Sequence, residues 1–167
     1  LVNNLVGSGQ ALLGIINDIL DLSKIEAGHF ELAKVEFDPR ELIAEITDLF
    51  GERCTSKGIE FIYFVAEEVP HRVIGDPARL RQVLINLVGN AIKFTERGEI
   101  LVEVSFAGST PEFATLLCSV KDTGIGIDRE ERSRIFESFH QIDRSMSRSQ
   151  GGTGLGLSIV KHIVILH

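Results

Sequence analysis

The chain has 167 residues, of which 44% are hydrophobic and 25% are charged, and its formal net charge is −7 at pH 7. This length supports one good hydrophobic core with a small appendage, and the acidic balance argues against a nucleic-acid-binding surface. No apolar run reaches the roughly 18 residues of a membrane span, and the first residues lack the basic start of a signal peptide.

The first 25 residues predict an amphipathic helix. Leu5, Leu12, Ile16 and Ile19 share one sector, and further apolar residues widen that sector to roughly half of the circumference. Such a wide apolar stripe needs more than one neighbour. Two interpretations stay open: the helix packs on its own domain, or it belongs to a helical bundle whose other helices lie outside this chain.

The rest of the chain alternates between strand and helix patterns. Two of the predicted helices begin with an Asp-Pro pair, in which Asp caps the helix and Pro occupies its first turn. The expected elements are strands at 30–37, 59–66, 99–108 and 113–122, and helices at 39–57, 76–95, 128–136 and 153–167. Residues 70–75 are expected to be a short connection. This order predicts a mixed β-sheet covered by helices on one face.

One of these helices, residues 76–95 (DPARLRQVLINLVGNAIKFT), is apolar around most of its circumference. Its narrow polar strip includes Asn86 and Asn90, which are i, i+4 neighbours, and Lys93 lies one turn beyond. A helix this apolar should be buried, so the strip must face something polar. Two amides and an ammonium suit a metal-bound polyphosphate. A solvated strip on a half-exposed helix is the alternative.

Two later stretches combine glycines with the ends of predicted elements. VKDTGIGID (120–128) places an acid and two glycines directly after an apolar run, and GGTGLGLSIV (151–160) places four glycines at the start of a helix. Exposed backbone amides at a helix N-terminus bind anions together with the helix dipole. No GK[ST] follows, so the second stretch is not a P-loop. A lone glycine motif is weak evidence for a binding site. The helix at 76–95 followed by these two stretches is a specific combination of three segments.

Together the three segments resemble the nucleotide-binding boxes of the GHKL ATPase superfamily, and the sequence around them is similar to sensor histidine kinases of the hybrid type. RLRQVLINLVGNAIKFT resembles the N box, DTGIGI the first glycine box, IFESFHQID the phenylalanine box and GGTGLGLSIV the second glycine box. INDILDLSKIEAG, near the start, is similar to the second bundle helix of such kinases.

The resemblance implies an α/β fold, a two-layer sandwich of a mixed β-sheet covered by helices, preceded by a long N-terminal bundle helix. It assigns residues 1–29 to part of the dimerisation and histidine-phosphotransfer bundle, and residues 30–167 to the catalytic ATP-binding domain. In the family two more strands follow the last helix, so we expect one edge of the sheet to be incomplete here.

The resemblance also implies a site for ATP and Mg²⁺. Asp122 would accept a hydrogen bond from the adenine amine, and the amide oxygen of Asn90 would be a magnesium ligand. Asn86 would touch phosphate or an ordered water, and Lys93 would balance phosphate charge. The further implied nucleotide contacts are Gly124, Gly126, Ile127, Phe136, Gly152, Thr153, Gly154, Leu155 and Gly156. The alternatives are a turn or capping role for Asp122 and a solvated side chain for Lys93.

The segment between the last two boxes, residues 140–152, is polar and has no apolar period, so we expect a mobile loop. Phe136 and Phe139 are expected to be core anchors that tether it. Arg144 and Arg148 would reach the γ-phosphate when the loop closes, or else they are simply solvated.

By resemblance, the reaction transfers the γ-phosphoryl group of ATP to a histidine, for relay to a response-regulator aspartate. The family acceptor is followed by an acid and then typically by Leu-Arg-x-Pro. None of the chain's histidines has this context: His29, His71, His140, His162 and His167. We therefore expect the acceptor helix to precede residue 1.

Two other functions stay open. A GHKL ATPase that hydrolyses ATP carries a glutamate base four residues before the magnesium asparagine, where this chain has Asn86, and an amide cannot take a proton. The second is a nucleotide-sensing module without kinase activity.

The expected partners are ATP, the phosphoacceptor helix of the parent kinase, and a response regulator or receiver domain. We expect a homodimer in the full-length protein and no nucleic acid. Cys54 and Cys118 lie far apart and outside any CxxC motif, which is typical of reduced thiols in the cytosol. The expected location is therefore cytoplasmic, as the cytosolic part of a sensor whose membrane anchorage the sequence leaves open.

Overall fold

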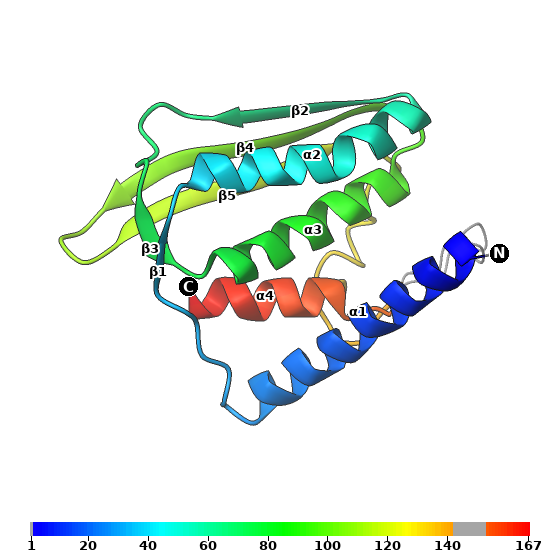
Figure 1. Ribbon diagram of the computed structural model, residues 1–167, viewed down its shortest axis with the longest axis horizontal. Coiled ribbons are helices and arrows are strands. Elements are labelled where there is room, and N and C mark those ends of the chain that lie inside the picture. The colour runs from blue at the N-terminus through cyan, green and yellow to red at the C-terminus, as the bar shows by residue number, and fades with distance from the viewer. Residues whose placement is uncertain (1, 142–152) are drawn as a thin grey trace. The chain divides into compact units, whose positions relative to one another are not determined.

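The computed structural model describes residues 2–141 and 153–167 and divides the chain into two compact units. Unit 1 comprises residues 1–31 and 128–167, and unit 2 comprises residues 32–127. The elements labelled in Figure 1 are α1 (Val2–Glu26), β1 (Val35–Phe37), α2 (Pro39–Lys57), β2 (Ile59–Val65), β3 (Val73–Gly75), α3 (Pro77–Phe94), β4 (Gly98–Ser109), β5 (Ala114–Asp122) and α4 (Gly156–Leu166). None of the helices in the described ranges is both long and apolar enough to cross a bilayer.

Unit 2 contains a mixed sheet and a separate strand pair. The mixed sheet has the order β2–β4–β5, with β2 parallel to β4 and β4 antiparallel to β5. β1 pairs only with β3, antiparallel, so that Val35 lies opposite Gly75 and Phe37 opposite Val73. The predicted mixed sheet is confirmed, but the prediction was wrong about β1, which lies outside that sheet, and about residues 73–75, which form a strand. Because β3 offers only three residues for pairing, β1 is shorter than the predicted strand at 30–37.

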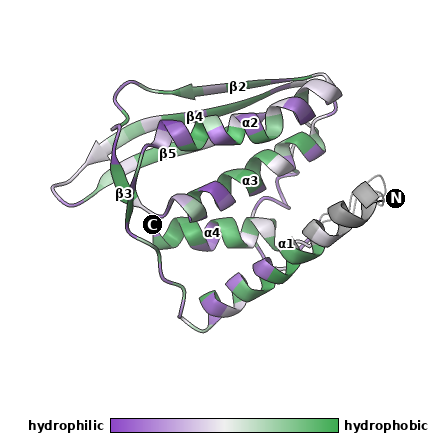
Figure 2. Cartoon of the chain, in the orientation of Figure 1, coloured by the Kyte–Doolittle hydropathy of each residue, from purple (hydrophilic) through white to green (hydrophobic). Residues whose placement is uncertain are grey.

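α2 and α3 cover one face of the mixed sheet, which confirms the two-layer arrangement (Figure 1). Apolar side chains from both helices meet those of β4, and Figure 2 shows hydrophobic residues along all three elements. Val88 and Ile92 of α3 are fully buried, as expected for so apolar a helix. Each such side chain stabilises the fold by about 1.5–3 kcal/mol relative to its exposed state. The core residues include Leu42, Ile43, Ile46, Phe50, Cys54, Leu84, Ala91, Ile100, Val102 and Val104.

Both helices of unit 2 begin at the predicted Asp-Pro pairs. Asp38 accepts a hydrogen bond from the amide of Arg40 at 2.8 Å, and Asp76 accepts one from the amide of Arg79 at 3.0 Å. The second carboxylate oxygen of Asp76 also accepts the amide of Ala33 at 2.9 Å. Asp76 therefore caps α3 and at the same time holds the segment that leads into β1.

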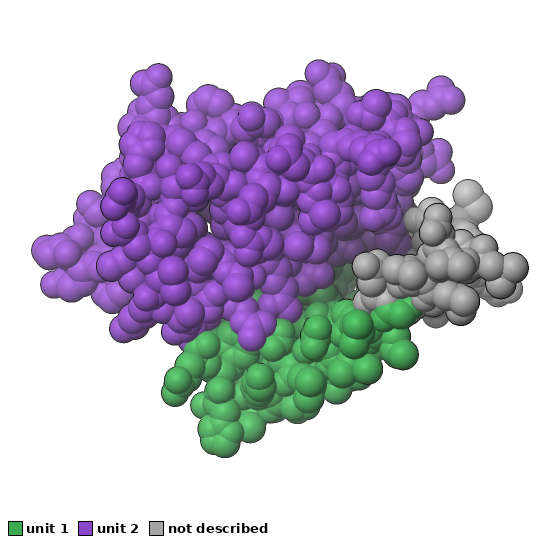
Figure 3. All heavy atoms as spheres, in the orientation of Figure 1, with its two compact units in different colours: residues 1–31, 128–167 green, residues 32–127 purple. Residues whose placement is uncertain are grey.

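Unit 1, coloured green in Figure 3, contains α1 and α4, which contact each other. The predicted N-terminal helix is confirmed. Asp21 and Leu22 of α1 are buried, and burial, together with the neighbouring Asp21 charge, raises the pKa of Asp18. Much of the predicted apolar face remains exposed, as the values for Leu12 (58%) and Ile16 (44%) show. The side chain of Leu5 lies outside the described part.

Two predictions in unit 1 were wrong. Residues 128–136 form successive turns instead of a helix: the amide of Glu131 donates to the carbonyl of Asp128, and that of Glu137 to Arg134. Most of the bonds in this segment are of this i→i+3 kind, and the one i→i+4 bond within these described residues, from the amide of Ile135 to the carbonyl of Glu131, does not continue into the ladder of an α-helix. α4 begins at Gly156 and not at residue 153, because Gly154 has a left-handed φ of +72°.

Candidate functional site

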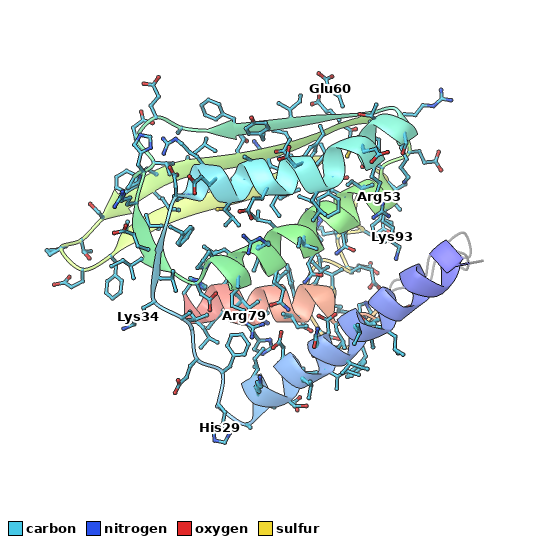
Figure 4. All side chains as sticks on the ribbon, viewed as in Figure 1. His29, Lys34, Arg53, Glu60, Arg79 and Lys93 are labelled. Atoms are coloured by element: carbon cyan, nitrogen blue, oxygen red, sulfur yellow. The ribbon has the colours of Figure 1, made fainter. Side chains whose placement is uncertain are left out.

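Part of the polar strip of α3 consists of side chains that form no hydrogen bond or ion pair with another described residue. Asn86, Asn90 and Lys93 are all half-buried, on the helix whose other side chains fill the core of unit 2. Neither amide side chain bonds another described residue. The ammonium of Lys93, labelled in Figure 4, lies 4.9 Å from the ring centroid of its neighbour Phe94. The two amide oxygens are possible ligands for Mg²⁺, and the ammonium can pair with phosphate charge. Together they fit a magnesium-bound phosphate group.

The DTGIGI loop leaves the end of β5 and is fastened to the start of β4. The amide of Thr123 donates to the carbonyl of Glu99 at 3.2 Å, and the amide of Glu99 donates to the Thr123 hydroxyl at 3.0 Å. Asp122 is exposed, and its Oδ1 accepts the amide of Gly124 at 2.9 Å. The carboxylate thus has a fixed orientation and keeps its other oxygen unused among the described residues.

The same loop docks on the last turn of α3. The amide of Ile125 donates to the carbonyl of Phe94 at 3.3 Å. A β-carbon at Gly124 would lie 2.5 Å from that carbonyl oxygen and 2.7 Å from Asp122 Oδ1, so only glycine fits there. Gly126 has a left-handed φ of +67°, which also favours glycine. The structure therefore brings Asp122 to the end of the helix that carries Asn90.

Sequence reasoning missed the role of Thr123, which ties this loop to β4. The one visible signal was Gly98, the glycine directly before the predicted strand at 99–108. Its φ is +117°, and a β-carbon there would collide with the Thr123 hydroxyl. The two positions are far apart in sequence, and their contact follows from the pairing of β4 with β5.

In unit 1 the phenylalanine box and the second glycine box are joined through their backbones. The amide of Phe139 donates to the carbonyl of Gly154 at 3.0 Å. A β-carbon at Gly154 would lie 2.8 Å from the carbonyl carbon of Phe139 and 2.9 Å from the carbonyl oxygen of His140. Glycine at this position therefore allows the two boxes to lie side by side.

The N-terminus of α4 is free of a side-chain cap. Its N-cap is Leu155, whose side chain is buried and whose amide donates to the hydroxyl of Thr153 at 3.2 Å. The first amides of the helix, from Gly156 onward, point along its axis with the positive end of the dipole and fit an anion. Leu155 can therefore serve a ligand only through its backbone. Gly152, Arg144 and Arg148 lie outside the described residues, as does the predicted loop beyond residue 141.

The core-anchor prediction for the two phenylalanines was wrong. The side chain of Phe136 is 37% exposed and that of Phe139 is 65% exposed. Phe139 has a positive φ of 64°, and it anchors the segment through its amide rather than through its ring. The next residue, His140, is held by Glu131, with 2.7 Å between Nε2 and Oε2.

The predicted site residues thus form two groups. Asn86, Asn90, Lys93 and the residues of the DTGIGI loop belong to unit 2, whereas Phe136 and the residues at the start of α4 belong to unit 1. Within unit 2 the bond from Ile125 to Phe94 links the DTGIGI loop to α3, and within unit 1 the bond from Phe139 to Gly154 links the two boxes. That both groups bind one nucleotide stays a prediction.

Comparison with known proteins identifies the protein family to which this chain belongs. The family described as "Histidine kinase-, DNA gyrase B-, and HSP90-like ATPase" matches residues 75–167. This range holds α3, the DTGIGI loop and α4, the elements that carry the two groups. The chain belongs to this family. Within it, the chain belongs to the histidine kinases, because the solved catalytic domain of histidine kinase ThkA matches with 36% identity and a TM-score of 0.64, covering 81% of this chain and 82% of that chain.

The chain is 44% identical over 163 residues to "Signal transduction histidine-protein kinase BarA" of Escherichia coli (strain K12), a match that covers 98% of this chain and 18% of BarA. It is 44% identical over 157 residues to "Sensor protein GacS" of Pseudomonas syringae pv. syringae, covering 94% of this chain and 17% of GacS. The chain therefore spans less than a fifth of the length of these curated relatives.

Solved structures agree with the fold. Full-length ShkA in complex with AMPPNP matches with a TM-score of 0.80 and 36% identity, covering 99% of this chain and 33% of ShkA. Histidine kinase ThkA in complex with response regulator protein TrrA matches with a TM-score of 0.67 and 30% identity, covering 97% of this chain and 42% of that chain. The α/β sandwich is thus a fold that this chain shares with the histidine kinase ThkA.

Proposed function

We propose that this chain binds ATP with Mg²⁺ and transfers the γ-phosphoryl group to a histidine on a bundle helix outside it, for relay to a response-regulator aspartate. The observation that carries the proposal is the docking of the DTGIGI loop on the last turn of α3. This docking brings the loop that carries Asp122 to the end of the helix that carries Asn90 and Lys93, which supports one site for adenine and phosphate. The relatives named as histidine kinases support the same reaction.

Each residue has a distinct task in this proposal. The free oxygen of Asp122 accepts the adenine amine, and the close approach of Gly124 to the end of α3 fixes the loop that carries this carboxylate. Asn90 supplies an amide oxygen to Mg²⁺, and the charge of Lys93 offsets that of the phosphates. When bound, Mg²⁺ neutralises charge that develops on the phosphate oxygens. The rate then comes mainly from positioning and electrostatic stabilisation.

The polar strip also sets phosphoryl transfer apart from hydrolysis. Asn86 occupies the position at which hydrolytic relatives carry a glutamate base, and its amide cannot accept a proton from water. Water bound beside it therefore stays a weak nucleophile, and a positioned histidine takes the phosphoryl group.

We also propose a cytoplasmic location, a homodimer in the full-length protein, and a response regulator as the partner that receives the phosphoryl group. Cys54 and Cys118 are both free thiols, as expected in the cytosol. The complex of ThkA with TrrA provides the precedent for a regulator bound to a related kinase.

The test compares Asp122→Ala with Asp48→Ala in a titration with a fluorescent ATP analogue and Mg²⁺. Asp48 is an exposed residue of α2, so it controls for the loss of one surface charge. Losing the adenine acceptor should cost about 1–3 kcal/mol, which weakens binding roughly ten- to a hundredfold. Equal affinities for the two variants would remove the adenine assignment.

A further inference from the structure

The last turn of α3 leaves carbonyl groups that the helix itself cannot satisfy. The carbonyl of Ala91 accepts the amide of Thr95 at 3.0 Å, within the same turn. The carbonyl of Phe94 accepts Ile125 of the DTGIGI loop, as described above. The carbonyl of Ile92 accepts the ammonium of Lys57 at 2.7 Å. Two of these carbonyls are therefore held from outside the helix, one by the glycine loop and one by α2.

Lys57 is well placed for this contact. It is the last residue of α2, and Gly58, with a left-handed φ of 70°, ends the helix directly after it. Its neighbour one turn back, Cys54, is buried in the core, so the end of α2 is packed in place. Figure 4 shows Arg53 of α2 and Lys93 of α3 at the same end of this helix pair. A cation at a helix C-terminus also interacts favourably with the helix dipole.

The bond from Lys57 to the carbonyl of Ile92 affects the polar strip of α3, because Ile92 lies between two residues of that strip. Ile92 follows Asn90 by two residues and precedes Lys93 by one, so its carbonyl belongs to the turn from which both side chains project. Without a donor, this carbonyl would turn towards water and the turn would fray. Fraying would move the amide and the ammonium away from the positions that a magnesium-bound phosphate requires.

We propose that Lys57 is a positioning residue for the magnesium nucleotide: it makes no contact with the nucleotide but fixes the last turn of α3 through the carbonyl of Ile92. This inference rests on the proposed function. It concerns the phosphate half of the ligand, because the adenine half is assigned to Asp122.

The test compares Lys57→Met, which removes the donor and the charge, with Lys57→Arg, which keeps both. Lys34→Met is the matched control, because Lys34 is exposed and has no partner among the described residues. Binding is measured at a temperature at which circular dichroism shows every variant to be fully folded, so that a change in global stability alone leaves the affinity unchanged. Hydrogen exchange of the amides at 92–96 is measured without nucleotide.

Lys57→Met should weaken Mg·ATP binding by about three- to tenfold, and Lys57→Arg should restore most of it. Adenosine, which lacks phosphates, should bind with an affinity changed by less than about twofold. Exchange at 92–96 should be faster in Lys57→Met than in Lys34→Met. Mg·ATP affinity and exchange rates that match the control would overturn the inference alone. If the unmodified chain bound no Mg·ATP, the proposed function would fail, and this inference with it.

Discussion

At position 124 the backbone of the DTGIGI loop passes so close to the end of α3 that a side chain has no room. The obstacle is backbone, the carbonyl of Phe94, and not the movable tip of a side chain. The residue is therefore specified by the docking of the loop and not merely by a turn. The same contact orients Asp122, whose carboxylate bonds the amide of Gly124.

Gly124→Ala should consequently damage both the fold and the site. Forcing a methyl group against fixed backbone costs about 1–3 kcal/mol in the free energy of unfolding. The control is Gly51→Ala in α2, where a β-carbon meets nothing within 4 Å. That change should instead stabilise the protein by about 0.5–1 kcal/mol, because alanine is the better helix former. Urea unfolding measures both, and equal stability of the two variants would contradict the close approach at Gly124.

At the scale of elements, the sequence predicted best what is decided locally. α2 and α3 begin where Asp-Pro pairs predict, because the capping bond and the fixed φ of proline act within a few residues. β3 was missed because Val73–Gly75 becomes a strand only by pairing with β1, which is 36 or more residues away along the chain for each pair in the register. The turns at 128–136 were mistaken for a helix because their composition suits both.

The candidate site was predictable to a similar extent. Asn86, Asn90 and Asp122 stand out by type and spacing, and in the structure the loop that carries Asp122 docks on the end of α3. The contacts of Thr123 and Lys57 with residues 24 and 35 positions away were invisible, because they depend on tertiary packing. The exposed ring of Phe139 shows the opposite error, in which an aromatic residue was assigned to a core by its type alone.

The cap of α3 leads to a prediction about pH. Burial acts to raise the pKa of Asp76, but the amides of Ala33, Arg79 and Ala78 and the charge of Arg79 outweigh it, so the pKa is held below its usual range. A lowered pKa in the folded state means that Asp76 contributes stability above its unfolded pKa of about 3.9, and that this stability is lost as pH falls through the folded value. Acid should therefore weaken the start of α3.

Asp76→Ala should lower the free energy of unfolding by about 1–2 kcal/mol at neutral pH, and the difference from the unmodified protein should shrink below about pH 4. Asp38→Ala is the matched control, since Asp38 also caps a helix before a proline, but among the described residues its carboxylate accepts only one backbone amide, that of Arg40. Asp38→Ala should lower the free energy of unfolding by less than Asp76→Ala does. Urea unfolding at pH 7 and pH 3 measures both, and a difference for Asp76→Ala that is the same at the two pH values would refute the linkage.

At the scale of the whole molecule, the exposed apolar residues of α1 point to a partner. Figure 2 shows hydrophobic residues along the described part of this helix. Leu12, Ile16 and Ile19 are each at least 44% exposed. Isolated exposed apolar residues are ordinary, but a row of them along one helix is typical of an interaction surface. The resemblance to histidine kinase bundles makes the phosphoacceptor helix the occupant that we expect.

If the acceptor histidine lies on a partner helix, the chain itself should not become phosphorylated. Several of its histidines are engaged within the protein: His140 with Glu131, His162 with the carbonyl of Ser158 at 2.7 Å, and His71 with Asp38 at 3.6 Å. In-line transfer needs a nucleophile held close to the γ-phosphorus, and histidines held elsewhere do not meet this condition. With radiolabelled ATP the chain alone should therefore take up no acid-labile phosphate.

Adding the acceptor helix of the parent protein should produce acid-labile label on that helix. Replacing Ile16 by Asp in the chain should reduce this transfer by about tenfold or more, because a charge replaces an apolar side chain that we expect to be buried against the helix. The affinity for Mg·ATP should stay unchanged, since α1 contributes no residue to the proposed nucleotide contacts. Label on the chain alone would refute the assignment of the acceptor. Unlabelled helix together with intact ATP binding would favour a nucleotide-sensing module, because binding would then occur without transfer.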